Sequence, residues 1–301
     1  MSSRRIEPGA FLVLAAAMLW GTSGTTQALA PDGATSLGVG SIRVVLGGVT
    51  LVAIARARGL FRGGKRWAPL PTAVMALSVA SSQLAFFASV QRTGVAIGTI
   101  VTIGSSPVAA GLFAFLFGGE RPSRAWLIAT ALAVVGCSML VASGGDVAVD
   151  PAGIVLALLA GAGYAAYTVS SKRLLAEHRS GAVIAVAFGL AAIPLAFVLA
   201  SQDLGWVTRS SGFLAVLHLG FVTVAVAYTL FARGLATVPS GTAVTLTLAE
   251  PLTAAILGVL VLGERLTATS VAGSMLLLVG LVILTLGSRP SKQELAASLE
   301  A

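Results

Sequence analysis

The chain has 301 residues, of which 56% are hydrophobic and only 10% are charged, and its formal net charge is +8. So few charged side chains cannot cover a soluble protein of this length, and most of the chain therefore needs lipid around it. The single cysteine, Cys137, excludes an intrachain disulfide framework, and no spacing typical of a metal site is present.

Apolar segments of about 20 residues, long enough to cross a hydrocarbon layer as a helix, follow one another along the chain. The first has a basic flank like a signal peptide, but it lacks a convincing small-residue cleavage site and precedes further spans, so we keep it as a helix. We predict an all-α membrane protein with ten transmembrane helices. In chain order, the predicted spans are Ala10–Ala30, Ser36–Ala55, Pro71–Gln91, Val95–Phe117, Ala125–Ser143, Gly153–Ser171, Gly181–Ala200, Gly212–Ala232, Thr242–Leu262 and Val271–Gly287.

The basic residues are distributed unevenly between the two sides of these spans. With a cytoplasmic N-terminus, fifteen of the 19 basic residues fall in cytoplasmic segments, and the outer loops hold only Arg92, Arg209 and Arg265. This is the positive-inside pattern, and it predicts that both termini are cytoplasmic. Because the membrane accounts for the positive charge, no nucleic-acid partner is expected.

The two halves of the chain match after a shift of 144 residues. Gly119-Glu120-Arg121 then falls on Gly263-Glu264-Arg265, Pro107 on Pro251, and Trp20 on Tyr164. We predict a first five-helix repeat over residues 1–145, a second over 146–288, and a cytoplasmic tail over 289–301. Because five is odd, the second repeat enters the membrane from the opposite side, an architecture typical of transporters.

Ten spans arranged as five plus five, together with Trp20-Gly21, Glu250-Pro251 and the repeated Gly-Glu-Arg, resemble the drug/metabolite transporter superfamily of the EamA type. The resemblance covers nearly the whole chain, and within the superfamily it is nearest to a bacterial exporter of aromatic and other amino acids. It implies a transporter of the bacterial inner membrane with a central cavity lined by spans one to four and six to nine.

Glu250 lies near the middle of the ninth span, on the order of 13 Å deep. A carboxylate there is a functional candidate by default, for substrate or for protons, although it could equally hold helices together. Its neighbour Pro251 lacks an N–H and would free the carbonyl of Thr247, and Pro107 would do the same for Ile103. We therefore expect bends at matching points of the two repeats.

Arg43 lies about seven residues into the second span and needs a partner. It could meet a substrate carboxylate, or it could pair with Glu250, Gln27 or helix-end carbonyls. We favour the second role and class Arg43, Pro107 and Pro251 as structural or gating residues.

Aromatic and polar side chains form stripes at helical spacing on spans one, three, six and eight. Such stripes suit a cavity for a mostly apolar zwitterion, although any single aromatic could simply pack in the membrane. With Glu250, the candidate cavity residues are Trp20, Gln27, Gln83, Phe87, Tyr164, Tyr167, His218 and Tyr228.

Small residues repeat every seven positions in spans five and ten, including Gly136 and its equivalent Gly280. This spacing predicts a close-packed seam, so we expect these two helices to support the bundle rather than line the cavity.

Export of amino acids is the leading hypothesis, with proton coupling left open. Export of drugs, sugars or nucleotide-linked metabolites is the alternative, but phosphorylated substrates would need more cationic residues in the cavity than Arg43. An enzyme is not expected, because no nucleophile with a base stands at membrane depth, and neither a cofactor nor a metal is expected. The partners foreseen are an amino-acid substrate and the lipid bilayer, with the chain acting as a monomer; a channel or structural subunit would leave the duplication unexplained.

Overall fold

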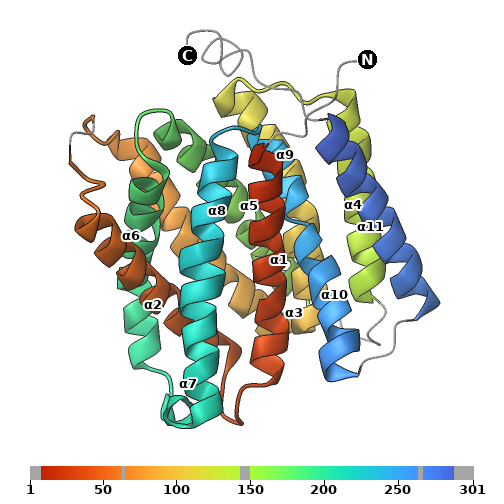
Figure 1. Ribbon diagram of the computed structural model, residues 1–301. Coiled ribbons are helices and arrows are strands. Elements are labelled where there is room, and N and C mark those ends of the chain that lie inside the picture. Colours follow the sequence, from red (N-terminus) through yellow and green to blue (C-terminus); the bar gives the residue numbers. More distant parts are fainter. Residues whose placement is uncertain (1–7, 63–64, 143–149, 264–266, 288–301) are drawn as a thin grey trace.

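A computed structural model describes residues 8–62, 65–142, 150–263 and 267–287. Within these ranges every regular element is helical (Figure 1). The elements in chain order are α1 (Pro8–Ala28), α2 (Ser36–Ala57), α3 (Pro69–Gly118), α4 (Arg124–Ala142), α5 (Pro151–Leu175), α6 (Ser180–Ala200), the short 3₁₀ helix η1 (Gly205–Thr208), α7 (Ser210–Leu217), the π-helix η2 (His218–Val226), α8 (Ala227–Leu235), α9 (Ser240–Leu246), α10 (Ala249–Leu262) and α11 (Ala268–Gly287).

Each predicted span falls on one helix, on part of one, or on consecutive helices. Among the described residues, eight helical stretches are long and apolar enough to cross a membrane. Two further apolar helices, Val101–Phe117 and Arg124–Met139, are shorter. The fold is therefore that of a helical membrane protein.

Helix α3 contains two of the predicted spans, and the chain reverses direction between them. A β-carbon placed on Gly98 would lie 3.3 Å from the backbone nitrogen of Val90. In a straight helix, residues eight apart are separated by about 12 Å. The first arm, Pro69–Thr93, therefore runs beside the second arm, Val101–Phe117, rather than in line with it.

The ninth predicted span is broken at mid-length, where α9 ends at Leu246 and α10 begins at Ala249. The break precedes Pro251, whose ring prevents a regular helix in the preceding turn. We predicted that the Thr247 carbonyl would be free, and this was wrong, because it accepts the Glu250 N–H at 2.9 Å. The bend predicted at Pro107 does not interrupt the helix: α3 continues through it.

The helix ends at Gly119 and Gly263 have the same geometry, 144 residues apart. Both glycines are left-handed, with φ of 70° and 71°. Each donates its backbone N–H to the carbonyl five residues earlier, Ala114 in α3 and Gly258 in α10. Glycine adopts this conformation without the steric penalty of a side chain, which explains why it ends both helices.

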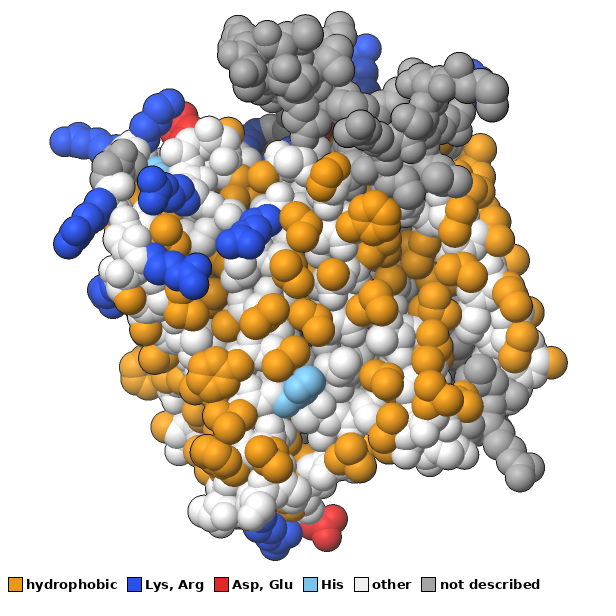
Figure 2. Space-filling view, viewed as in Figure 1, with side chains coloured by type: hydrophobic (Ala, Val, Ile, Leu, Met, Phe, Trp, Pro, Cys, Tyr) orange, Lys and Arg blue, Asp and Glu red, His pale blue; other side chains and the backbone are white. Residues whose placement is uncertain are grey.

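The bundle has one basic end, where α1 begins and α11 ends (Figure 1). Figure 2 shows Lys and Arg side chains gathered at this end, above a belt of mainly apolar surface. Exposed residues of the basic end include Arg56, Arg58, Arg62, Lys65 and Arg66. Large apolar side chains such as Phe197 and Leu260 are 77% and 76% exposed on the flanks, which suits contact with lipid.

Helices α4 and α11 pack backbone to backbone through glycines. A β-carbon on Gly136 would lie 2.5 Å from the Leu277 nitrogen, and one on Gly280 would lie 2.7 Å from the Ala129 carbonyl oxygen. Such distances leave no room for a side chain, as the seam predicted from sequence requires. None of the described side chains of these two helices lines the cavity.

Candidate functional site

A cavity of about 770 Å³, its open mouth included, lies among α1, α2, both arms of α3, α5, α8 and the junction of α9 with α10. The lining side chains mix aromatic, charged and hydroxyl groups: Trp20, Arg43, Ser82, Gln83, Phe86, Thr102, Ile103, Ser106, Tyr164, Tyr228, Thr247 and Glu250.

Trp20 is held in one orientation at the aromatic side of the cavity. Its Nε1 donates a 2.8 Å hydrogen bond to the carbonyl of Thr223, in the π-helical segment η2. The indole centroid lies 4.6 Å from the ring of Tyr228 and 6.5 Å, edge-on, from that of Tyr164. Trp20 and its sequence equivalent Tyr164 therefore meet at the cavity, and π-helical turns are frequent at functional sites.

Arg43 and Glu250 bring opposite charges to the cavity without an ion pair between them. Among the described residues, neither side chain has an oppositely charged partner within 4.0 Å. Arg43 Nη2 makes one long contact of 3.5 Å to Gln83 Oε1, and its Nε is buried without a partner among those residues. Charges at this depth ordinarily pair with something, so both are available to a ligand.

Three hydroxyls lie on the wall made by the second arm of α3 and the α9–α10 junction. Thr102 Oγ1 donates to the Ala157 carbonyl of α5 at 3.2 Å, and Ser106 Oγ donates to the Thr102 carbonyl at 2.6 Å. Thr247 Oγ1 donates to the Val244 carbonyl at 2.7 Å. Each hydroxyl proton is thus directed to the backbone.

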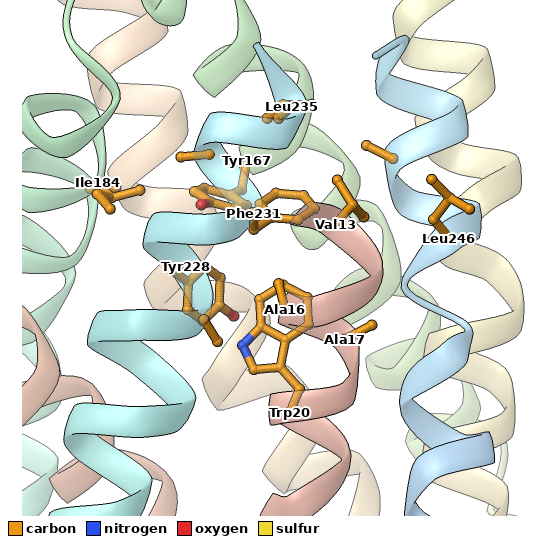
Figure 3. Close-up of a cluster of buried hydrophobic side chains, with 14 of the residues drawn as sticks. Val13, Ala16, Ala17, Trp20, Tyr167, Ile184, Tyr228, Phe231, Leu235 and Leu246 are labelled. Carbon is orange, nitrogen blue, oxygen red and sulfur yellow. The ribbon is translucent and has the colours of Figure 1, made fainter. Parts of the chain in front are cut away.

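Toward the basic end, the cavity is closed by a layer of packed side chains. Val13, Tyr167 and Phe231 lie across the bundle on the basic side of Trp20 and Tyr228 (Figure 3). All three of the layer's side chains are fully buried, at 1% exposure or less.

At the surface of the basic end, Glu120 joins three spans. Its carboxylate accepts the Ser240 N–H at 2.7 Å and the Ser240 hydroxyl at 3.1 Å, and it lies 3.4 Å from Lys172 Nζ. Lys172 also donates to the Val238 carbonyl. Glu120 follows α3, Lys172 ends α5 and Ser240 begins α9, so the cluster ties these helices together above the buried layer.

The structure brings Trp20, Gln83, Tyr164, Tyr228 and Glu250 together at the cavity, and Arg43 with them. The other four candidates lie outside its lining. Gln27 donates to Ser36 Oγ at 3.0 Å, and His218 Nε2 lies 2.8 Å from Thr22 Oγ1. Tyr167 belongs to the buried layer, where its ring stacks on Phe231 at 6.4 Å.

Phe87, the remaining candidate, faces α2 instead of the cavity. A β-carbon on Gly40 would lie 1.9 Å from the Phe87 ring, which shows how closely the ring covers that glycine. Its neighbour Phe86 lines the cavity. Consecutive helical residues point about 100° apart, so the prediction of Phe87 instead of Phe86 selected a different face of the helix.

Five further residues line the cavity but were not predicted from the sequence: Ser82, Thr102, Ile103, Ser106 and Thr247. Serine and threonine are common in membrane helices, where they bond to their own backbone, and composition alone does not separate these from the rest. Helical spacing gave a usable signal: Ser82 and Phe86, and Thr102 and Ser106, are each four residues apart.

Comparisons with known proteins agree with this architecture. The EamA-like transporter family matches the chain twice, over residues 7–142 and 151–286. The uncharacterized transporter YwfM of Bacillus subtilis is 41% identical over 288 residues, covering 95% of this chain and 97% of that protein. The threonine/homoserine exporter RhtA of Escherichia coli is 32% identical over 268 residues, covering 86% and 85%. A crystal structure of 20% identity has the same fold, with a TM-score of 0.82 over 95% of this chain and 98% of that one.

Proposed function

The chain belongs to the EamA-like transporter family, and we propose that it exports neutral amino acids, aromatic ones included, by alternating access through the central cavity. Its relatives are named transporters, and its helices are those of a membrane protein. Amino acids as the substrate class are supported by the name of the Escherichia coli relative, a threonine/homoserine exporter.

One observation carries the substrate class: a guanidinium and a carboxylate line the same aromatic cavity, and neither forms an ion pair with any described residue. An amino acid is a zwitterion, so Arg43 would hold its carboxylate and Glu250 its ammonium group. Trp20, Phe86, Tyr164 and Tyr228 supply aromatic surface for a side chain. A phosphorylated metabolite fits less well, because Arg43 is the single cationic side chain among the described lining residues.

The proposed topology is ten spans arranged as two inverted repeats, with the basic end in the cytoplasm. The two separate family matches and the matching caps at Gly119 and Gly263 support duplication. The meeting of Trp20 with Tyr164 across the cavity is what a two-fold relation between the repeats would produce. The positive-inside pattern supports the orientation.

The proposed cycle starts from the state seen here, in which the basic end is closed by the buried layer and by Glu120. Export requires a second state in which the layer of Val13, Tyr167 and Phe231 separates and admits substrate from the cytoplasm. The break between α9 and α10 supports a hinge at that level, since discontinuous helices at the site recur in transporters.

The direct test is exchange of labelled solutes by purified protein in liposomes. We expect uptake of phenylalanine, threonine or methionine, and none of sugar phosphates or nucleotide sugars. Exchange of a phosphorylated solute but of no amino acid would overturn the proposal. The same vesicles with and without a pH gradient test coupling: if neither rate nor accumulation changes, a role for Glu250 as proton carrier is ruled out.

A further inference from the structure

The hydroxyls of Thr102, Ser106 and Thr247 all donate their protons to backbone carbonyls. A hydroxyl has one proton to donate and two lone pairs that accept. The protons of all three are directed to the carbonyls of Ala157, Thr102 and Val244. Toward the cavity these side chains can therefore only accept hydrogen bonds. Glu250, which lines the cavity near Thr247 in the chain, is also an acceptor when ionised.

The donors of the cavity stand on different elements. Arg43 on α2 has five N–H donors and no acceptor. Gln83, on the first arm of α3, uses its Oε1 to accept from Arg43 at 3.5 Å, which leaves its amide N–H groups as donors. Of these groups, the donors lie on α2 and the first arm, and the groups that can only accept lie on the second arm and the α9–α10 junction. The hydroxyls of Ser82, Tyr164 and Tyr228, also in the lining, can donate or accept.

We infer that Thr102, Ser106, Thr247 and Glu250 form an ammonium subsite that selects substrates with a free primary amine. An ammonium group carries three donors and no acceptor, so it fits a wall that can only accept. The carboxylate of the same solute then lies at Arg43 and Gln83, and the side chain lies against the aromatic residues. This inference rests on the proposed transport of amino acids. To the pairing of Glu250 with the ammonium group it adds three hydroxyl acceptors and selection for a free primary amine.

Selection at this subsite has a chemical consequence. A hydroxy acid, in which a hydroxyl replaces the ammonium group, brings one neutral donor in place of three donors and a positive charge, so Glu250 loses its charged partner and most of the wall oxygens lose a donor. A site built to bond a polar group discriminates strongly against an analogue that lacks it. An amino-acid amide, by contrast, keeps the ammonium group and loses only the charge at Arg43.

The test is competition against labelled L-phenylalanine and, in parallel, L-threonine exchange in proteoliposomes. Each amino acid is compared with its hydroxy-acid analogue and with its amide. In Thr102→Val, Ser106→Ala and Thr247→Val, we expect the preference for amino acid over hydroxy acid to fall about 10-fold, because a hydrogen bond to a charged group is lost. The preference for amino acid over amide should stay as in the wild type.

The controls separate a binding role from a structural one. Thr102→Ser keeps the hydroxyl and should restore the preference, which matters because Thr102 also bonds to α5. Thr229→Val removes a hydroxyl that bonds its own helix at Ala225 but does not line the cavity, and it should change neither preference. Arg43→Gln should reduce the preference for amino acid over amide and leave the preference for amino acid over hydroxy acid as in the wild type.

Two results would overturn the inference, and they are distinguishable. In the first, the wild type exchanges amino acids, and Thr102→Val, Ser106→Ala and Thr247→Val prefer amino acid over hydroxy acid as strongly as the wild type. The ammonium subsite is then wrong and the proposed function stands. If the wild type exchanges no amino acid, both proposals fail together.

Discussion

The carboxylate of Glu120 accepts the backbone N–H of Ser240 at 2.7 Å and so caps the first turn of α9 from another span. The first N–H groups of a helix have no partner within it, and a negative charge there is also favoured by the helix dipole. With Lys172 Nζ at 3.4 Å, the cluster links α5, α9 and the end of α3 at the basic end. The repeat shift aligns Lys172 with Ala28, so the other half has no matching lysine at the corresponding position.

Removing this carboxylate should favour opening of the basic end. We expect Glu120→Ala to raise the population of the open state about 10-fold, since hydrogen bonds to charged groups contribute about 1.5–3 kcal/mol. The measurement is the rate at which an impermeant maleimide labels Ser171→Cys from the basic side, in a Cys137→Ala background. Ser171 is buried at 1% exposure behind the cluster.

Lys65→Gln is the matched control for the Glu120 variant. It breaks an ion pair with Glu177 at the same end, but the two side chains are 71% and 46% exposed. An exposed pair contributes little, so the labelling rate should stay near that of the background protein. Equal labelling of Ser171→Cys with and without Glu120 would show that the cluster does not control opening.

The indole of Trp20 has two separable roles, a hydrogen bond and an aromatic surface. Trp20→Phe removes the bond to Thr223 but keeps a ring against Tyr228, whereas Trp20→Ala removes both. We expect amino-acid exchange to fall severalfold in the first variant and at least about 10-fold in the second, since a buried neutral hydrogen bond contributes about 1 kcal/mol and an aromatic ring more. Exchange in Trp20→Ala at the wild-type rate would remove Trp20 from the site.

The α4–α11 seam should tolerate no added side chain. In Gly136→Ala the new methyl would lie 2.5 Å from the Leu277 nitrogen, so the helices must move apart. Overpacking of this kind costs about 1–3 kcal/mol, and we expect a lower unfolding temperature in detergent. Gly24→Ala is the control, because a β-carbon there meets nothing within 4 Å. If the two variants melt alike, the seam is looser than described.

Topology can be mapped at the repeated Gly-Glu-Arg. Single cysteines at Arg121 and Arg265, in the Cys137→Ala background, should be labelled from opposite sides of the membrane. Inverted repeats require this result, because each repeat contains an odd number of spans. Labelling of both positions from the same side would contradict the inverted architecture and the cycle built on it.

Hydropathy predicted the helices well because a membrane imposes a length and an apolar composition on each span. Periodicity also placed Trp20, Tyr164 and Tyr228 at one site, and depth singled out Arg43 and Glu250. Hydropathy, periodicity and depth within a span can all be read from the local sequence once the apolar segments are recognised as membrane spans.

Features that depend on how helices face one another were not predictable in the same way. Whether Phe86 or Phe87 lines the cavity depends on the rotation of α3 about its axis. In the structure the Phe87 ring packs against Gly40 of α2, which leaves Phe86 at the cavity. The Glu120–Ser240 bond joins residues 120 apart in sequence, and neither residue type indicates the other. The π-helix around Thr223 is a local change in backbone hydrogen bonding, and the amino-acid composition of the segment does not predict it.

The central claim is that Arg43 and Glu250 bind the two poles of a transported amino acid in one cavity. It is tested most directly by amino-acid exchange in proteoliposomes containing Arg43→Gln or Glu250→Gln, with Lys65→Gln as a charge-removal control at the exposed basic end. We expect each cavity variant to lose at least about 10-fold in exchange rate, because each removes a charge-assisted bond to the substrate, while the control keeps the wild-type rate. If both cavity variants fold as the wild type does and exchange amino acids at its rate, the claim is contradicted.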